Sequence, residues 1–426
     1  MGRAIAKLKR ILKRCRQKLT PSHSPSTCKS IKVLHGNRIF KVRELCAILD
    51  ISTPEKYMNV KNRYVTNTIL FNKLEKKGLC KKQISTGENF SESYYQKLEK
   101  RAQQFNNMYQ KMKTFKHSDS ELLQFYVDYL YTFNHLGYTP YDYFVYEIWH
   151  RTPEEADAFI NSPFRLLLAR TFNQRKYTKL FNNKVLFNNT FNKYINRDWL
   201  YTGQCTLEDF TSFAKKHPRL LAKPTDGLMG RGIEIIAVGE KDIETVFKTC
   251  RDSKLIVEEI ISNTGSINEL NDTTINTVRI CTLLDVHNEP NVVMAGIRVG
   301  RKDGVADNLN RGGLLALIDV ETGKIISDGM DLGQVLYDKH PDSGTTFKGF
   351  QIPQWHKVIE LAKDAARVVP QVKLVGWDIA ITSDDKIEFI EGNHNPDLHM
   401  MQEPDQIGKK HLFQKYIDEL NDSKNS

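Results

Sequence analysis

The sequence predicts an α+β sandwich preceded by a mostly helical N-terminal region. Two observations support this prediction. Apolar residues recur at helical spacing from about residue 40 to 180, whereas short runs rich in Val, Ile, Leu and Thr follow one another from about residue 200. Few helices separate these runs, and strands gathered in this way favour an α+β arrangement over a doubly wound parallel sheet.

The composition is that of a folded protein with two or three domains. The chain has 426 residues, 40% of them hydrophobic, which is enough for a sizeable core. The seven cysteines lack metal-ligand and redox spacing and no secretory leader is evident, so we expect a cytoplasmic protein. No apolar run approaches the ~20 residues that a membrane-spanning helix needs.

Residues 1–19 carry a large share of the net charge of +11. They contain eight Lys or Arg and no acid, and a helix there would align Ile5, Leu8 and Ile11 opposite the bases. We expect this basic amphipathic helix to bind an anionic membrane surface, which would keep the protein peripherally on the inner face of the membrane. A frayed tail, or a helix docked on the protein itself or on a partner, is the alternative. Nucleic acid is not an expected partner, because the run lacks interleaved aromatic residues.

The rest of the chain divides into four segments. Residues 20–35 form a linker rich in Pro, Ser and Thr that we expect to be flexible. Residues 36–164 are the predicted helical region, in which the stretch 152–155 reads Thr-Pro-Glu-Glu, a typical helix start. Residues 165–261 and 262–421 hold the strand-like runs and are expected to form two subdomains.

Short apolar runs bounded by Gly, Asn and Asp predict the strands of these two subdomains. The runs lie at 219–224, 233–238, 254–261, 273–285, 291–300, 313–320, 374–382 and 386–393. Helices are predicted at 240–250, 354–369 and about 405–420.

The most informative stretch covers residues 376–399. Two apolar runs separated by a polar turn predict a hairpin, with Asp378 on its first strand and Glu391 and Asn393 at the end of its second. Three hard oxygen donors would then converge on one point, which is how proteins hold Mg²⁺ beside nucleotide phosphates. A hairpin with polar residues on its solvent face explains this stretch equally well when it is taken alone.

A glycine-rich turn follows the apolar strand that ends at Lys223 and Pro224. Its glycines, Gly227, Gly230 and Gly232, would let the backbone approach phosphate oxygens, and Lys223 would add a positive charge. The turn is neither a Walker A loop nor a dinucleotide fingerprint, because a strand rather than a helix follows it. Taken alone, a hairpin with a surface lysine is the simpler interpretation.

The run 254–261 is an apolar strand that ends in Glu258 and Glu259. Such a strand can serve as a hinge whose backbone meets an adenine edge while a nearby carboxylate takes a ribose hydroxyl. The signal is weak by itself, since many strands end in acidic residues.

Three arginines lie on or near the strands that follow. Arg279 and Arg298 are each set among apolar strand residues, and Arg311 precedes a Gly-Gly pair. An arginine inside an apolar strand is costly unless it meets an anion, and its planar fork matches carboxylate or phosphoryl oxygens. The pattern therefore favours anion binding over a purely structural salt bridge.

The order of these features matters more than any one of them. A lysine with a glycine-rich hairpin, a hinge strand, strand arginines and then Asp…Glu-x-Asn resembles the ATP-grasp fold, in which two α+β subdomains clamp ATP. The resemblance covers about residues 165–420 and is closest to the sugar-transfer-associated ATP-grasp family found with polysaccharide biosynthesis genes. The stretches that support this closer match are 137–149, 275–282 and 340–355.

The resemblance implies a set of nucleotide contacts. Lys223 would hold the α- and β-phosphates, and the glycines of the loop 227–232 would form a flexible phosphate lid. The family usually has an earlier lysine on the lid subdomain. Lys184 is the candidate here, with Lys179 and Lys193 near enough in sequence to stay open.

The hinge would face the adenosine moiety. The resemblance places Glu258, Glu259 and Ile260 beside adenine and ribose. Glu258, Glu259 and Glu269 all stay open as the acid that meets the ribose.

The resemblance also assigns the reacting end of the site. Arg279 and Arg298 would steady the γ-phosphate and an acyl-phosphate. Asp378, Glu391 and Asn393 would ligate Mg²⁺.

His394 and His399 form a second possible metal pair. They lie five residues apart, share no helix face and have no third soft ligand nearby. We therefore expect a substrate-pocket or structural role rather than a zinc site.

The resemblance implies an ATP- and Mg²⁺-dependent carboxylate–amine ligase that works through an acyl-phosphate. The expected partners are a small-molecule or lipid-linked sugar substrate and an amine co-substrate, in capsule or cell-surface polysaccharide biosynthesis. Two alternatives stay open. One is an ATP-grasp-type kinase that phosphorylates a sugar or small molecule, and the other is a non-catalytic nucleotide-binding scaffold.

Overall fold

The computed structural model describes residues 104, 108, 129, 132, 136–226, 232–240, 242–263, 265–302, 312–382 and 386–423. The predictions for residues 1–19 and 20–35, and most of that for 36–164, lie outside the described residues, as do Gly227, Gly230 and Arg311. The chain divides into two compact units, residues 1–167 with 406–410 and residues 168–405 with 411–426. We call them the N-terminal and the C-terminal unit. Within the described part of the chain, no helix is long and apolar enough to cross a membrane.

The described part of the N-terminal unit is built from short helices. The predicted helix start at Thr152 is confirmed: the Thr152 hydroxyl accepts from the Glu155 amide at 3.2 Å, and the Thr152 amide donates to the Glu155 carboxylate at 2.7 Å. The helices of this region are α7 (Pro140–Val145), η2 (Ile148–His150), α8 (Pro153–Asp157) and α9 (Ser162–Phe172), of which α9 crosses into the C-terminal unit.

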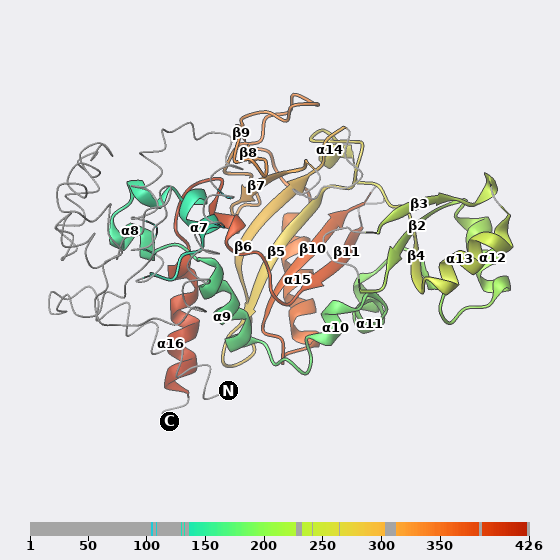
Figure 1. Ribbon diagram of the computed structural model, residues 1–426, viewed down its shortest axis with the longest axis horizontal. Coiled ribbons are helices and arrows are strands. Elements are labelled where there is room, and N and C mark those ends of the chain that lie inside the picture. Colours follow the sequence, from blue (N-terminus) through green and yellow to red (C-terminus); the bar gives the residue numbers. More distant parts are fainter. Residues whose placement is uncertain are drawn as a thin grey trace, which may run out of the picture. The chain divides into compact units, whose positions relative to one another are not determined.

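The C-terminal unit holds a seven-stranded sheet, which we call the large sheet. Its order is β11-β10-β5-β6-β7-β8-β9, and every neighbouring pair is antiparallel, as an α+β fold requires. The long central strands lie side by side in Figure 1. The strands are β5 (Thr277–Leu284), β6 (Pro290–Val299), β7 (Leu314–Ile318), β8 (Gly329–Met330), β9 (Leu336–Tyr337), β10 (Leu374–Ile381) and β11 (Ile387–Asn393).

A four-stranded sheet, the small sheet, lies in the same unit with the order β1-β4-β2-β3. Phe210 and Phe247, from two helices, pack with Leu220 and Val257 of its strands in a separate apolar core. The two helices lie together beyond the small sheet in Figure 1. The elements are β1 (Trp199–Tyr201), α12 (Leu207–Lys216), β2 (Arg219–Pro224), β3 (Glu234–Ala237), η4 (Val238–Glu240), α13 (Ile243–Asp252) and β4 (Leu255–Glu259).

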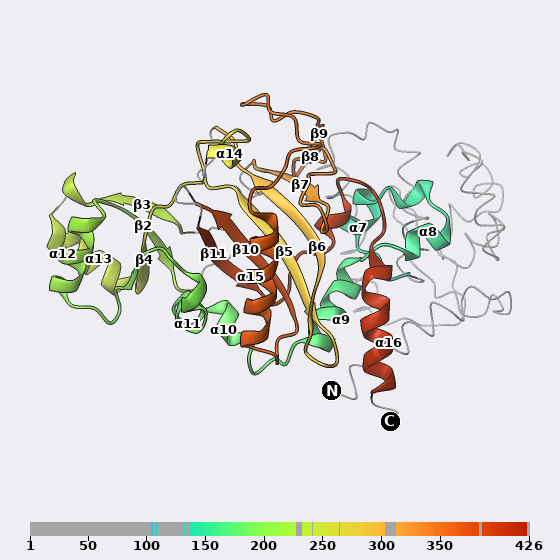
Figure 2. The same cartoon turned by 180° about the vertical axis from the view of Figure 1, so that it is seen from behind.

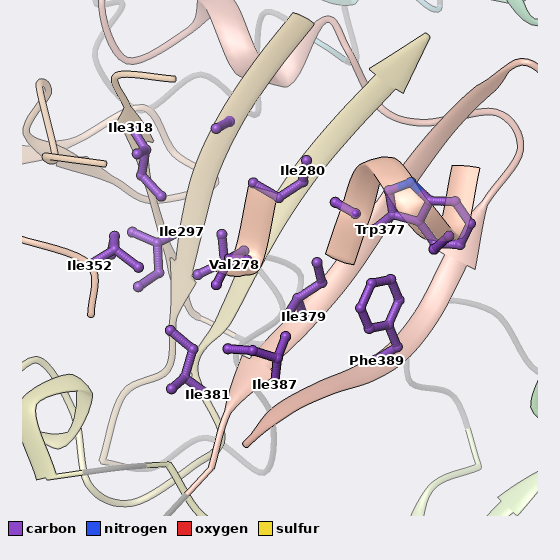
Figure 3. Close-up of a cluster of buried hydrophobic side chains, with 14 of the residues drawn as sticks. Val278, Ile280, Ile297, Ile318, Ile352, Trp377, Ile379, Ile381, Ile387 and Phe389 are labelled. Carbon is purple, nitrogen blue, oxygen red and sulfur yellow. The ribbon is translucent and has the colours of Figure 1, made fainter. Parts of the chain in front are cut away.

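One face of the large sheet carries the main core. On β10 the residues Trp377, Ile379 and Ile381 belong to this core, as do Val278 and Ile280 on β5, because alternate residues of a strand share a face. Figure 3 shows these side chains gathered together. Helix α15 (Trp355–Val368) packs against β5, β6 and β10 and lies across this part of the sheet in Figure 2.

The remaining elements of the C-terminal unit are short, apart from the last helix. The predicted helix at 405–420 is wrong in its first half. Gln406 has a φ of 54° and Gly408 follows it, so the chain leaves the right-handed helical region there. The elements are α10 (Lys179–Asn182), α11 (Lys184–Thr190), η3 (Asn192–Tyr194), α14 (Gly265–Asn268), η6 (Met400–Gln402), η7 (Lys410–Phe413) and α16 (Gln414–Asp422).

Candidate active site

The face of the large sheet that points away from the main core carries a row of charged residues. Asp378 on β10 lies between Arg279 on β5 and Glu391 on β11, which are its direct partners across the two ladders. Residues directly opposite each other on antiparallel strands share a face, so these three side chains stand in one row.

A β-bulge in β11 brings Glu391 to this face. Asp378 pairs with Glu391, but the next pair along the ladder reaches Phe389, so Ile390 is the extra residue. The extra residue shifts the alternation by one position. Phe389 therefore belongs to the main core while Glu391 stands with Asp378. In a regular strand Glu391 and Phe389 would share a face.

Asp378 is fully buried and is held by two arginines. Arg279 binds it through two nitrogens: Nη2 donates to Oδ2 at 2.8 Å, and Nε donates to Oδ1. Arg298 Nη2 lies 2.8 Å from the same Oδ2. Burial alone would raise the pKa of Asp378, but the charges of Arg279 and Arg298 outweigh it and hold the pKa at about 2. The carboxylate is therefore ionised at neutral pH.

Glu391 and Asn393 complete the polar group. Asn393 Nδ2 lies 3.2 Å from Glu391 Oε1 and 3.5 Å from Asp378 Oδ2. Burial, and then the neighbouring charge of Asp378, raise the pKa of Glu391. A buried and a half-buried carboxylate that repel each other are stabilised by a shared cation.

The donors of this group fit Mg²⁺. Asp378 and Glu391 offer carboxylate oxygens, and turning the Asn393 amide by 180° places its oxygen where Nδ2 now sits between them. An all-oxygen set with few protein ligands is what Mg²⁺ prefers beside phosphates. The predicted metal residues Asp378, Glu391 and Asn393 are thus brought together, with Asp378 shared between this group and the two arginines.

A glycine makes room for this arrangement. A Cβ at Gly376 would lie 2.7 Å from Pro396 Cβ and 3.3 Å from Arg279 Cδ. Gly376 pairs with Asn393 across the ladder. The Arg279 side chain passes over Gly376 and binds Asp378. Gly376 is not among the predicted site residues, although a glycine in a strand interior indicates a close approach by another group.

A second charged cluster lies on the face of the small sheet opposite its apolar core. The Lys223 ammonium on β2 binds Glu258 on β4, and both side chains are buried. Arg197 Nε also reaches Glu258, at 3.0 Å from Oε2. Burial would raise the pKa of Glu258, but Arg197 and Lys223 outweigh it and hold the pKa at about 2.

The same arginine reaches the large sheet. Arg197 Nη1 pairs with the Glu388 carboxylate and donates to the Phe389 carbonyl at 2.7 Å. The other Glu388 oxygen accepts from the Asn196 amide at 2.7 Å. Both Arg197 and Glu388 were missed in the sequence, although an acid within an apolar run is costly to bury and therefore indicates a buried partner.

Lys184 joins the two clusters electrostatically. Burial lowers its pKa, while the charge of Glu391 raises it and that of Lys223 lowers it further. The Lys184 amide also donates at 2.9 Å to the Thr225 carbonyl, just beyond β2, and helix α11, which begins at Lys184, packs against β11. Lys193 instead pairs with Asp364 at 2.6 Å on the surface. Of the three lysines left open by the sequence, the geometry favours Lys184; Lys179 is exposed.

The hinge residues differ in what their side chains do. The Glu258 carboxylate forms salt bridges with Lys223 and Arg197. Glu259 and Glu269 are therefore the candidates for a ribose contact. Glu259 Oε2 accepts from the Asp198 amide at 3.1 Å, and the side chain of Ile260 is exposed.

Gly232 is the member of the predicted phosphate loop that the structure describes. Its φ is 71°, and a Cβ there would lie 2.9 Å from Pro224 Cγ. The turn therefore requires glycine at this position, for conformation and for space.

His394 of the predicted histidine pair is hydrogen-bonded to another side chain. His394 Nε2 lies 3.0 Å from Asn182 Oδ1. Among the described residues, one group of three His, Cys or acidic side chains has its ligand atoms close enough together to share an ion, and it consists of Asp198, His217 and Glu259. The Lys216 ammonium already pairs with Asp198.

The chain is similar to a known family of proteins. The family model of the sugar-transfer associated ATP-grasp domain matches residues 164–417. Among curated proteins the search finds no match.

Several solved structures are similar in chain trace. One is the ATP-grasp ligase PsnB complexed with a minimal precursor, at 13% identity and a TM-score of 0.38, over 58% of this chain and 64% of that one. A second is the ADP complex of purK, the N5-carboxyaminoimidazole ribonucleotide synthetase, at 14% identity and a TM-score of 0.33, over 51% and 46%. A third is D-alanyl-alanine synthetase A from Vibrio cholerae, at 11% identity and a TM-score of 0.35, over 57% and 66%. The match spans two thirds or less of each of these proteins.

Proposed function

Because the chain belongs to the sugar-transfer-associated ATP-grasp family, we propose that it is an ATP- and Mg²⁺-dependent ligase that joins a carboxylate to an amine. The observation that carries the proposal is the position of Lys184. Its amide donates at 2.9 Å to the Thr225 carbonyl, just beyond the strand of Lys223, and helix α11, which begins at Lys184, packs against β11, the strand of Glu391. One triphosphate could therefore bridge Lys223 and the group of Asp378, Glu391 and Asn393. Cations on one side and acids on the other are what a metal–nucleotide complex requires.

Each cluster has a distinct task in this proposal. Lys223 and Lys184 bind phosphate oxygens, and the loop that contains Gly232 covers them. Asp378, Glu391 and Asn393 hold Mg²⁺, which supplies positive charge to the phosphates when it is bound.

The arginines stabilise charge during the reaction. A substrate carboxylate attacks the γ-phosphorus, and the bond between this phosphorus and the bridging oxygen of the β-phosphate breaks. ADP is the leaving group, and the product is an acyl-phosphate. Arg279 and Arg298 lie beside Asp378 and can share their N–H donors between that carboxylate and the transferred phosphoryl group.

The amide forms in the second step. The amine nitrogen attacks the acyl carbon, the carbon–oxygen bond to phosphate breaks, and the nitrogen loses a proton as phosphate leaves. No covalent enzyme nucleophile is needed. Catalysis rests on positioning, charge stabilisation and exclusion of water.

The biological setting follows from the family and from the N-terminal charge. The family's association with sugar transfer supports a sugar acid, free or lipid-linked, as one substrate and an amino acid or similar amine as the other, in capsule or cell-surface polysaccharide assembly. The basic residues 1–19 would hold the enzyme at the cytoplasmic face of the membrane.

Product analysis tests this proposal. Purified protein is incubated with Mg²⁺ and ATP across a panel of uronic acids and amino acids, and ADP and free phosphate are measured. We expect phosphate release that needs both a carboxylate and an amine.

Two other outcomes would point elsewhere. ADP with a phosphorylated sugar, and no free phosphate, would identify a kinase. ATP binding without turnover on any pair would favour a nucleotide-binding scaffold.

A further inference from the structure

We propose that Arg197 is a positioning residue that ties the phosphate-binding lysine of the small sheet to the strand that carries the metal ligands, an inference that rests on the proposed function. Arg197 precedes β1 and its side chain is 2% exposed. Its hydrogen bonds go to Glu258, to Glu388 and to the Phe389 carbonyl. Glu258 binds Lys223, and Glu388 lies on the strand of Glu391.

The first contact is to the small sheet. Arg197 Nε and Nη2 lie 3.0 and 3.2 Å from the two oxygens of Glu258. Glu258 is in turn the carboxylate that receives the Lys223 ammonium. The orientation of Glu258, and through it the place of Lys223, therefore depends on the guanidinium.

The second contact is to the large sheet. Arg197 Nη1 binds the Glu388 carboxylate and the Phe389 carbonyl of β11. Glu391 follows on the same strand, across the bulge at Ile390. One guanidinium thus links the carboxylate that binds Lys223 to the strand that carries Glu391.

Arginine suits this position for two reasons. Its planar fork can serve two carboxylates and a carbonyl in fixed directions, whereas a lysine presents one compact head group. The cluster of Arg197, Lys223, Glu258 and Glu388 also contains two cations and two anions, so these buried charges balance.

A buried ion cluster could also serve stability alone. The two roles differ in one respect. If Arg197 acts on the nucleotide through Lys223, its loss matters only while Lys223 is present. If it merely supports the fold, its effect on nucleotide affinity adds to that of any other change.

A double-mutant cycle separates these roles. ATP affinity is measured by calorimetry for the full chain and for Arg197→Lys, Lys223→Ala and the double variant. We expect Arg197→Lys to weaken ATP binding by about tenfold, and by less than about twofold when Lys223 is already alanine. Equal losses in both backgrounds, or no loss in the first, would overturn the proposal.

Two further variants keep the test decisive. Glu388→Gln keeps the side-chain size and weakens the second contact, and it replaces Arg197→Lys in the cycle if that variant does not fold. Tyr194→Phe, which removes the 2.9 Å hydrogen bond to Asp364 just upstream, is the matched control. It is expected to lower Tm and leave ATP affinity unchanged.

The outcomes also distinguish this inference from the proposed function. A wild-type protein that binds no ATP overturns both. A wild-type ligase whose ATP affinity is unaffected by Arg197→Lys retains the proposed function and loses this inference alone.

Discussion

At the residue scale, the carboxylates of Asp378 and Glu391 differ in their surroundings. Asp378 is ionised because Arg279 and Arg298 hold it. Glu391 lies beside that negative charge and its pKa is raised, first by burial and then by Asp378. Removing either carboxylate should abolish metal binding, but with opposite consequences for stability.

Glu391→Gln is the cleaner test of the metal site. We expect Mg²⁺-dependent ATP turnover to fall by about 100-fold or more, because one of two anionic ligands is lost. The Tm in EDTA should stay the same or rise, since a neutral side chain removes the repulsion with Asp378. Full turnover in this variant would contradict the metal assignment.

Asp378→Asn should behave differently. It leaves Arg279 and Arg298 without their carboxylate, and breaking a buried ion pair in this way costs about 3–5 kcal/mol. We expect a clearly lower Tm than for Glu391→Gln, measured without metal in both. A Tm equal to that of wild type would show that the arginines do not depend on Asp378.

Gly376 is a further single-residue determinant. Gly376→Ala forces Pro396 or Arg279 to move, and overpacking of this kind costs about 1–3 kcal/mol. We expect lower Tm together with reduced turnover. Gly239→Ala is the matched control, because no heavy atom lies within 4 Å of a Cβ there. Equal behaviour of the two variants would remove the steric argument.

At the element scale, register decides which residues face the site. In β10 the alternation that places Trp377 and Ile379 in the core leaves Asp378 on the other face, and the sequence alone predicts this. In β11 the same rule fails after Phe389, since Ile390 forms a bulge. The local sequence pattern of β11 cannot reveal that Ile390 is an extra residue, because a bulge is defined by the pairing of one strand with another.

The short strands were missed for a related reason. β8 and β9 contain two residues each and β1 contains three, so they are too short to show an alternating pattern. The predicted strands at 219–224, 374–382 and 386–393, by contrast, agree with β2, β10 and β11 to within one residue at each end.

The loop around His340 depends on a buried histidine that is expected to be neutral. His340 is buried, its Nε2 donates to the Gly300 carbonyl at 2.8 Å, and its Nδ1 faces the amides of Asp342 and Ser343. Both contacts suit the neutral ring. Burial, together with nearby Arg301, lowers the pKa of His340, although the Gly300 contact and Asp342 oppose the shift.

The sign of the pH effect follows from linkage. The unfolded histidine has a pKa of about 6.5, so below that pH the unfolded chain binds a proton that the folded chain resists. We expect the free energy of unfolding to fall as pH is lowered from about 7 toward the depressed folded pKa. Urea unfolding should show a smaller decline in His340→Gln. The same pH dependence in both proteins would count against this role.

At the scale of the whole molecule, the N-terminal charge gives a prediction about location. The basic residues 1–19 should bind anionic lipid by charge and by their apolar stripe. We expect the full chain to float with vesicles containing phosphatidylserine or another anionic lipid, and the chain lacking residues 1–19 to stay at the bottom. Equal flotation of both would assign membrane contact to another part of the protein.

The sequence by itself determined the order of functional elements. The lysine strand, the glycine turn, the hinge, the strand arginines and the acidic hairpin could all be found locally, because each is a short stretch of the chain with a recognisable pattern of residue types. That order was enough to indicate the family, to which the matched residues 164–417 assign the chain.

Tertiary structure alone decided which charges meet. The sequence pattern favoured an anion as the partner of Arg279 and Arg298, and the family resemblance implied that this anion is a phosphoryl group. In the structure both arginines bind the Asp378 carboxylate. Arg197 meets Glu388 although 191 positions separate them. Such pairings depend on strand register and on how two sheets of the C-terminal unit are joined, and no local pattern of residues encodes either.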